Sequence, residues 1–84
     1  MPQRVVFSIE ARADLRAIDR ETALRLLKAL ARFLATDTGN VKQVAGFDPP
    51  RYRLRIGKWR IIFRKSGDGV FEIVRVRNRR EAYR

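Results

Sequence analysis

The fold is decided by residues 51–64, RYRLRIGKWRIIFR, in which basic and large apolar side chains alternate on both sides of a Gly-Lys pair. An alternation with a period of two is typical of a strand that buries one face. Glycine at the first position of a two-residue loop is typical of a tight hairpin turn. We therefore predict two antiparallel strands joined by Gly57 and Lys58. This turn sets three cross-strand pairs, which are Ile56 with Trp59, Leu54 with Ile61 and Arg55 with Arg60.

A third strand is predicted after a second turn. Residues 66–69 are Ser-Gly-Asp-Gly, and a run rich in β-branched residues follows from Val70 to Arg77. A four-residue loop would pair Lys65 with Val70, and Arg60 with Arg75. Side chains alternate across a sheet, so one face would then collect the apolar residues Tyr52, Leu54, Ile56, Trp59, Ile61, Phe63, Val74 and Val76. The other face would collect the arginines Arg53, Arg55, Arg60, Arg64, Arg75 and Arg77, with Ile62, Phe71 and Ile73 among them.

The N-terminal half is predicted to be a strand followed by two helices. Arg4–Phe7 is a short β-branched and aromatic run, and Ser8 can cap a helix over Ile9–Ile18. A second helix over Glu21–Ala35 is indicated by apolar residues at helical spacing, which are Leu24, Leu27, Leu30, Ala31 and Leu34. We expect the two helices to form an αα-hairpin that covers the apolar face of the sheet, with residues 36–50 as a connection. The resulting order is βααβββ, an α+β fold with an antiparallel sheet, in a single domain over residues 1–84.

Composition excludes several classes of site. The chain has no cysteine and no histidine, which removes disulfides, thiolate and imidazole metal ligands, and a histidine base. Only Asp68, Glu72 and Glu81 are acidic within residues 51–84, too few for a two-metal phosphodiesterase. We therefore predict neither a metal nor a cofactor. The sequence contains no long apolar run and no signal peptide, so we expect a cytoplasmic protein with no membrane partner.

Positive charge is concentrated in the second part of the sequence. The net charge is +11, and residues 51–84 carry twelve Lys and Arg against three Asp and Glu. Ten of those twelve are arginines, whose planar fork suits bidentate contacts with phosphate. Such charge is typical of a protein that binds nucleic acid. A solubility surface, an anionic membrane surface and an acidic protein partner are the alternative explanations.

The predicted register would bring Arg55, Arg60 and Arg75 into a row across three strands. Like charges directly opposite one another destabilise a sheet, so the row indicates either an anion-binding floor or an outer face whose arginines extend into water. The chemistry left by the composition is metal-free RNA transesterification, in which arginines stabilise the phosphorane formed by attack of a 2′-hydroxyl. Arginine stays protonated and is a poor base. Tyr83, in a basic tail, is the best available general acid or base.

Three segments resemble the RelE/ParE toxin superfamily. Residues 52–64 resemble the central hairpin of that family, residues 76–84 (VRNRREAYR) are similar to its closing strand and tail, and residues 8–15 (SIEARADL) resemble the start of its first helix. With the predicted order of elements, the resemblance covers essentially the whole chain. It implies the toxin of a type II toxin–antitoxin system, a ribosome-dependent endoribonuclease that cleaves mRNA in the A site. It also implies a cognate antitoxin that neutralises the toxin in a hetero-oligomeric complex.

The resemblance implies particular catalytic residues. Arg53 and Arg55 fall where RelE enzymes place basic residues, usually lysines, and Arg60 matches an arginine that contacts the scissile phosphate. Arginine at positions 53 and 55 disfavours any step there that needs a neutral amine. Tyr83 matches the C-terminal catalytic tyrosine, and Arg79 is the nearest match to a tail arginine, with Arg77 and Arg80 as alternatives. The remaining arginines of the face and tail are predicted to bind RNA, namely Arg51, Arg64, Arg75, Arg77 and Arg80.

Two other functions are compatible with the same fold. Members of the ParE branch inhibit DNA gyrase and have no ribonuclease activity, and they generally lack this set of arginines and tyrosine. A plain RNA-binding or ribosome-binding module is the non-enzymatic alternative. Cleaved RNA ends would distinguish the ribonuclease from both alternatives, and inhibited supercoiling would identify the gyrase inhibitor.

Overall fold

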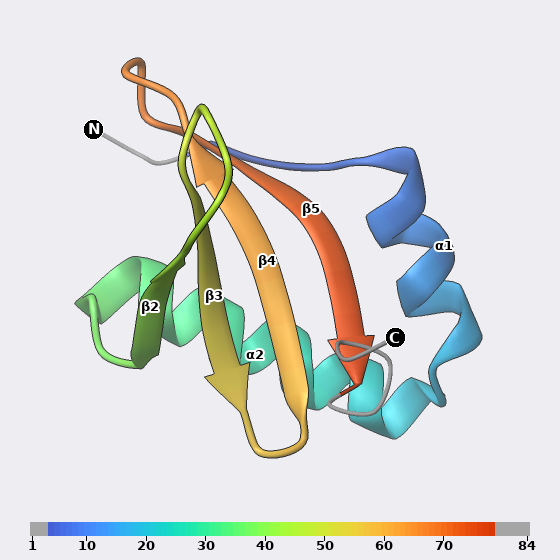
Figure 1. Cartoon of the computed structure of the whole chain (residues 1–84). Coiled ribbons are helices and arrows are strands. Elements are labelled where there is room, and N and C mark those ends of the chain that lie inside the picture. The colour runs from blue at the N-terminus through green and yellow to red at the C-terminus, as the bar shows by residue number, and fades with distance from the viewer. Residues whose placement is uncertain (1–3, 79–84) are drawn as a thin grey trace.

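The computed structural model describes residues 4–78, which form two helices and a five-stranded sheet (Figure 1). In chain order the elements are β1 (Arg4–Phe7), α1 (Ile9–Ala17), α2 (Arg20–Thr36), β2 (Asn40–Val44), β3 (Arg51–Ile56), β4 (Trp59–Lys65) and β5 (Val70–Asn78). The strands lie side by side in the order β1-β5-β4-β3-β2. β1 is parallel to β5, and all other neighbouring strands are antiparallel.

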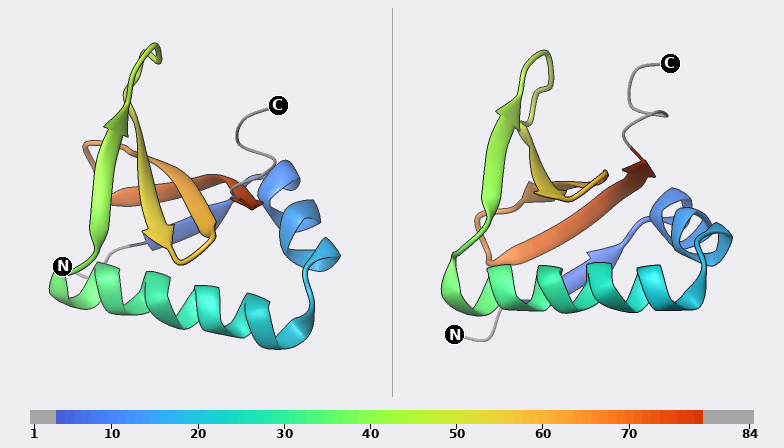
Figure 2. Two further views of the ribbon diagram at one scale, coloured as in Figure 1. Left: turned by 60° about the horizontal axis from the view of Figure 1, so that its bottom comes forward. Right: turned by 90° about the horizontal axis from the view of Figure 1, so that it is seen from below.

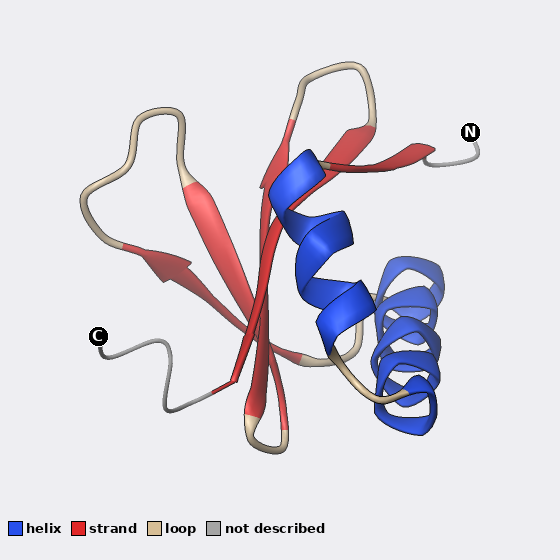
Figure 3. Cartoon of the chain, turned by 90° about the vertical axis from the view of Figure 1, so that its right-hand side faces the viewer, coloured by secondary structure: helices blue, strands red, loops and turns tan. Residues whose placement is uncertain are grey.

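The α+β class and the placement of both helices on one face are confirmed (Figure 3). The two helices meet at an angle rather than lying side by side: α2 passes beneath the sheet, and α1 turns away beside β5 (Figure 2). Neither helix of the described chain is long and apolar enough to cross a membrane. The core between the layers is formed by nine buried apolar residues, Ala11, Leu26, Leu30, Phe33, Leu54, Ile61, Phe63, Ile73 and Val76.

The sheet differs from the predicted one in two respects. It is mixed, because β1 joins the edge of β5 in parallel, and it contains the additional strand β2 within residues 36–50. β2 pairs along its whole length with β3, from Asn40 opposite Arg55 to Val44 opposite Arg51. Its side chains do not alternate regularly between buried and exposed positions. The strand is held by backbone hydrogen bonds to β3, which leave no periodic signal in the side-chain sequence.

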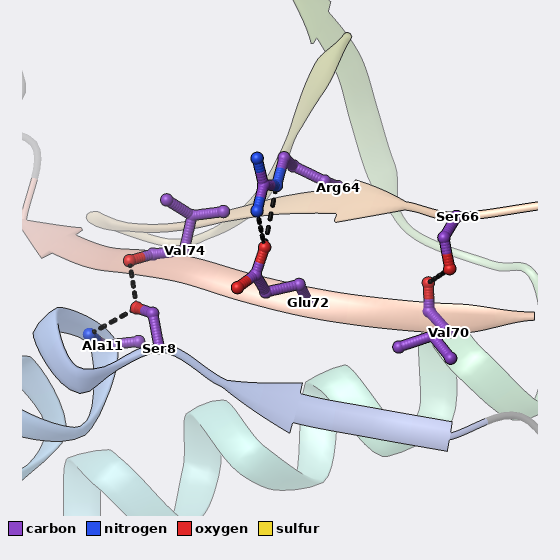
Figure 4. Close-up of polar contacts among 7 residues, drawn as sticks. All are labelled: Ser8, Ala11, Arg64, Ser66, Val70, Glu72 and Val74. Carbon is purple, nitrogen blue, oxygen red and sulfur yellow. Dashed lines mark hydrogen bonds and ion pairs between the residues drawn. The ribbon is translucent and has the colours of Figure 1, made fainter. Parts of the chain in front are cut away.

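Ser8 joins the start of α1 to β5. Its hydroxyl accepts a hydrogen bond from the Ala11 amide at 3.0 Å, which caps the helix as predicted. The same hydroxyl donates to the carbonyl of Val74 at 2.7 Å (Figure 4), and the Ser8 amide donates to the carbonyl of Ile73 at 2.9 Å. One residue therefore ends β1, begins α1 and fixes both to β5.

Asp19 caps α2 in the same manner. Its carboxylate accepts a hydrogen bond from the Thr22 amide at 3.0 Å. This bond, which favours the ionised form, lowers the pKa of Asp19 below its usual range. The helix ends at Thr36, and the C-cap residue Asp37 has a left-handed backbone and donates its amide to the carbonyl of Phe33.

The buried face of α2 is rotated from the predicted one. Leu26, Leu30 and Phe33 are buried, whereas Leu24 is 47% exposed. Two overlapping sets of apolar residues in this segment have helical spacing, one that contains Leu24 and one that contains Leu26 and Phe33. The prediction followed the first set. Leu30 and Leu34 of the predicted stripe do pack in or against the core. Leu26 and Phe33 extend the buried face to a side that was not predicted, where the rings of Phe33 and Phe63 lie 5.7 Å apart.

The register of β3 and β4 is as predicted, but that of β4 and β5 is not. Ile56 faces Trp59, Leu54 faces Ile61 and Arg55 faces Arg60. On β5, Lys65 faces Phe71 rather than Val70, and a β-bulge then shifts the pairing so that Arg60 faces Arg77 rather than Arg75. Val74 is the extra residue of the bulge, since Ile73 faces Phe63 and Arg75 faces Ile62. Because the shift at the turn precedes them, Phe71 and Ile73, which were predicted to lie among the arginines, belong to the core side, where Ile73 is fully buried.

Candidate nucleic-acid interface

The helices of the described chain cover one face of the sheet and leave the other uncovered (Figure 3). We call the uncovered side the open face. Strand register assigns to it residues that alternate with the core, namely Asn40, Lys42 and Val44 of β2, Arg51, Arg53 and Arg55 of β3, Arg60, Ile62 and Arg64 of β4, and Glu72, Arg75 and Arg77 of β5. The sheet is strongly twisted, and β2 and β3 stand up from the line of β5 (Figure 2). Eight cations and one carboxylate therefore share this face by register.

Arg60 lies at the centre of the open face. It is on β4, the middle strand of the sheet, and its pairing partners on the two sides are Arg55 and Arg77. We call these three residues the arginine row. Arg60 is only 6% exposed and is the one buried charged residue within residues 4–78. Because a guanidinium remains protonated, the row is a fixed concentration of positive charge.

Two arginines near the row form ion pairs within the chain. The guanidinium of Arg64 donates to the carboxylate of Glu72 on the neighbouring strand, with its Nε 2.8 Å from Oε1 (Figure 4). Arg75 donates from Nε and Nη2 to the two oxygens of Asp14 on α1, at 2.9 and 3.0 Å. Both residues were predicted to bind RNA. The shifted register places Arg75 opposite Ile62 rather than Arg60, and its guanidinium contacts Asp14 of α1.

Arg51 and Arg53 complete the basic surface of β3. The guanidinium carbon of Arg51 lies 4.3 Å from the centre of the Phe47 ring, a cation–π contact at the edge of the face. Arg53 faces Lys42 of β2 on one side and Ile62 of β4 on the other. The Nε atom of Arg53 is buried and has no hydrogen-bond partner in the described chain.

The structure thus brings together most of the predicted site. Arg53, Arg55 and Arg60 share one face of adjacent strands, as the sequence predicted, and Arg77 rather than Arg75 is opposite Arg60. Lys42 is an additional cation on this face, and it is absent from the predicted site because β2 was not predicted. The predicted tail residues Arg79, Arg80 and Tyr83 lie outside the described residues.

The fold is similar to that of proteins in solved toxin–antitoxin complexes. One chain of the archaeal RelE–RelB complex from Pyrococcus horikoshii matches with a TM-score of 0.75 and 21% identity, over 94% of this chain and 97% of that one. A chain of the RelBE2 complex from Mycobacterium tuberculosis matches with a TM-score of 0.74 and 23% identity, over 94% and 100%. A chain of the RelBE complex from E. coli matches with 0.63 and 14%, over 92% and 96%. These likenesses define the class as the RelE-like toxin fold.

The sequence itself supplies the family. Residues 5–83 match the family described as the ParE toxin of type II toxin–antitoxin systems. The chain therefore belongs to the ParE toxin family, within the RelE/ParE superfamily that its motifs resemble. No protein of curated function matches the sequence.

Proposed function

We propose that this chain is the toxin of a type II toxin–antitoxin system that acts as a ribosome-dependent endoribonuclease on mRNA in the A site. The observation that carries the proposal is the buried Arg60 between Arg55 and Arg77 on the open face. A preorganised cluster of guanidinium groups in a partly desolvated position suits the stabilisation of a phosphorane. Action on ribosomes would place the protein in the cytoplasm.

The proposed reaction needs no group beyond the protein and the RNA. The 2′-hydroxyl of the substrate loses its proton and attacks the adjacent phosphorus, and the bond to the 5′-oxygen of the next nucleotide breaks. The products are a 2′,3′-cyclic phosphate and a 5′-hydroxyl that takes up a proton. Arg60 and its neighbours would stabilise the charge on the phosphorane, and Tyr83, by its resemblance to the family's tyrosine, would exchange the protons.

The second candidate function is inhibition of DNA gyrase. It is favoured by one observation, the match of residues 5–83 to the ParE toxin family. A ribonuclease would cleave messengers and leave gyrase supercoiling intact, whereas a gyrase inhibitor would do the reverse. The test is to induce the chain in cells and measure both messenger ends and supercoiling. We expect new messenger ends inside translated frames, which disappear when initiation is blocked. Intact messengers with failing gyrase supercoiling would contradict the ribonuclease, and intact messengers with ribosome binding alone would indicate a non-catalytic module.

A cognate antitoxin is the expected protein partner, as in the RelE–RelB complexes that share the fold. One surface suits such a partner. A groove between α2 and the end of β3 is lined by three cations and one carboxylate, Arg25, Lys28, Arg32 and Glu21, and by the apolar residues Leu24, Ala29 and Ile56. An acidic amphipathic segment would complement both its charge and its apolar residues. We expect a hetero-oligomeric complex whose formation raises the melting temperature of the chain.

A further inference from the structure

We propose that Lys42 of β2 and Arg53 of β3 form a second phosphate-binding subsite on the open face, which holds the RNA next to the phosphate bound by the arginine row. The inference rests on the proposed function in taking RNA as the ligand. It adds a residue and a strand that the predicted site did not contain.

The two side chains are directed to the same side of the sheet. Lys42 and Arg53 are directly opposite one another in the antiparallel pair of β2 and β3. Their neighbours Val41 and Leu54, also opposite one another, pack into the core on the other side. Directly opposite residues have Cβ atoms about 4.5–5.5 Å apart, so the ammonium and guanidinium groups of the pair can reach one anion together.

The charges of this pair are not balanced within the described chain. Arg64 and Arg75 have Glu72 and Asp14 as counter-ions, whereas neither Lys42 nor Arg53 forms an ion pair with any of residues 4–78. Like charges in directly opposite positions destabilise a sheet. An arrangement that is unfavourable in the free protein becomes favourable when an anion bridges the two cations.

The Nε atom of Arg53 gives a second, independent indication of a ligand. It is buried, and it donates no hydrogen bond within the described residues. A buried donor without a partner is costly, and such atoms are rare in folded proteins. Arginine donates to phosphate through Nε and a terminal nitrogen as a planar fork, and a phosphate oxygen would supply the acceptor.

The position of the pair fits an RNA strand that passes Arg60. Arg53 faces Ile62, which is two residues from Arg60 on β4 and on the same face. Arg53 and Arg60 are therefore diagonal neighbours on adjacent strands, about 7–8 Å apart, comparable with the separation of neighbouring phosphates in a nucleic-acid strand. Ile62 is adjacent to both cationic positions and offers an apolar surface to the ribose or base that connects the phosphates.

The test compares Lys42→Gln with Arg16→Gln, which also removes one positive charge, from an exposed position on α1. The ligand is a short single-stranded RNA made uncleavable by 2′-O-methyl groups, and binding is measured over a range of salt concentrations. Loss of one phosphate contact makes the slope of log affinity against log salt less steep by about 0.7 for a single strand. We expect that decrease for Lys42→Gln and for Arg53→Gln, an unchanged slope for Arg16→Gln, and recovery of the wild-type slope in Lys42→Arg.

The outcomes separate this inference from the proposed function. An unchanged slope in Lys42→Gln, or no RNA binding by the wild-type protein, overturns the subsite even if the protein cleaves mRNA on ribosomes. Binding through Lys42 without any cleavage on programmed ribosomes supports the subsite and contradicts the ribonuclease. If Lys42→Gln weakens only the binding of an acidic antitoxin peptide and spares RNA, the pair serves a protein partner and the inference is wrong.

Discussion

Asp14 on α1 and Arg75 on β5 form a two-pronged ion pair, and the same carboxylate also accepts a hydrogen bond from the Val76 amide at 2.9 Å. β1 pairs with β5 only from Val70 to Ile73, so the edge of β5 is open beyond that point. Asp14 supplies an acceptor where a strand would otherwise have supplied a carbonyl. An acidic side chain on α1 thereby replaces the missing continuation of β1.

This relationship predicts that Asp14 stabilises the fold. Asp14→Ala removes the acceptor of the Val76 amide, and an unsatisfied, largely buried donor costs about 1–3 kcal/mol. Asp14→Asn keeps one acceptor oxygen and loses the charge, so we expect a smaller loss. Urea unfolding of the three proteins measures the difference. Equal stability of Asp14→Ala and the wild type would show that water replaces the carboxylate at this edge.

Gly39 is predicted to be required by close packing. A Cβ at this position would lie 2.9 Å from Leu54 Cδ1 and 3.4 Å from a ring carbon of Phe33, both in the core. Forcing an extra methyl group into a packed core costs about 1–3 kcal/mol. The matched control is Gly67→Ala, because a Cβ at Gly67 meets nothing within 4 Å. Thermal melting should show a lower Tm for Gly39→Ala alone, and a loss shared by both variants would contradict the packing argument.

Arg60 is predicted to serve cleavage. Loss of one transition-state donor costs about a hundred- to a thousandfold in kcat, and we expect Arg60→Ala to show this on programmed ribosomes. Arg60→Lys keeps the charge without the planar fork, so its kcat should fall between those of the wild type and Arg60→Ala. Leu54→Ala is the stability control, since a cavity in the core costs roughly 2–5 kcal/mol. If Arg60→Ala melts early yet cleaves normally per folded molecule, the arginine row is structural.

Tyr83 is predicted, from the resemblance to the family, to exchange protons with the RNA. Tyr83→Phe keeps the ring and deletes only the hydroxyl. We expect slower cleavage with nearly unchanged binding to ribosomes, which is the kinetic pattern of an interaction made in the transition state. Cleavage rate and ribosome affinity are measured on the same preparation. An unchanged rate would assign the proton transfers to another group.

The parts of the fold that could be predicted are those that the side chains specify directly. The hairpin at Gly57 was predicted because its turn residues and the flanking alternation agree on one register. That register is sufficient to bring Arg53, Arg55 and Arg60 to a common face, because strand alternation then determines the side of the sheet on which each residue lies.

The parts that could not be predicted depend on backbone pairing. Near the bulge, Ile73 and Val74 are adjacent and both apolar, so side-chain alternation is consistent with either register. β2 is defined by its hydrogen bonds to β3, and with it Lys42 reaches the open face. The exchange of Arg75 for Arg77 opposite Arg60 is a slide of two residues, one at the turn before β5 and one at the bulge, and a slide of two leaves both arginines on the predicted face.

The parallel pairing of β1 with β5 also governs when the protein can fold. Ser8 and Val74 are joined by a hydrogen bond although they lie 66 positions apart, and β1 has no other strand as neighbour. Contacts between segments so distant in sequence form late and slow folding. During synthesis, β1 therefore stays unpaired with β5 until β5 has left the ribosome. The proposed inhibitor of translation would thus acquire its complete sheet only after residues 70–78 have themselves been translated.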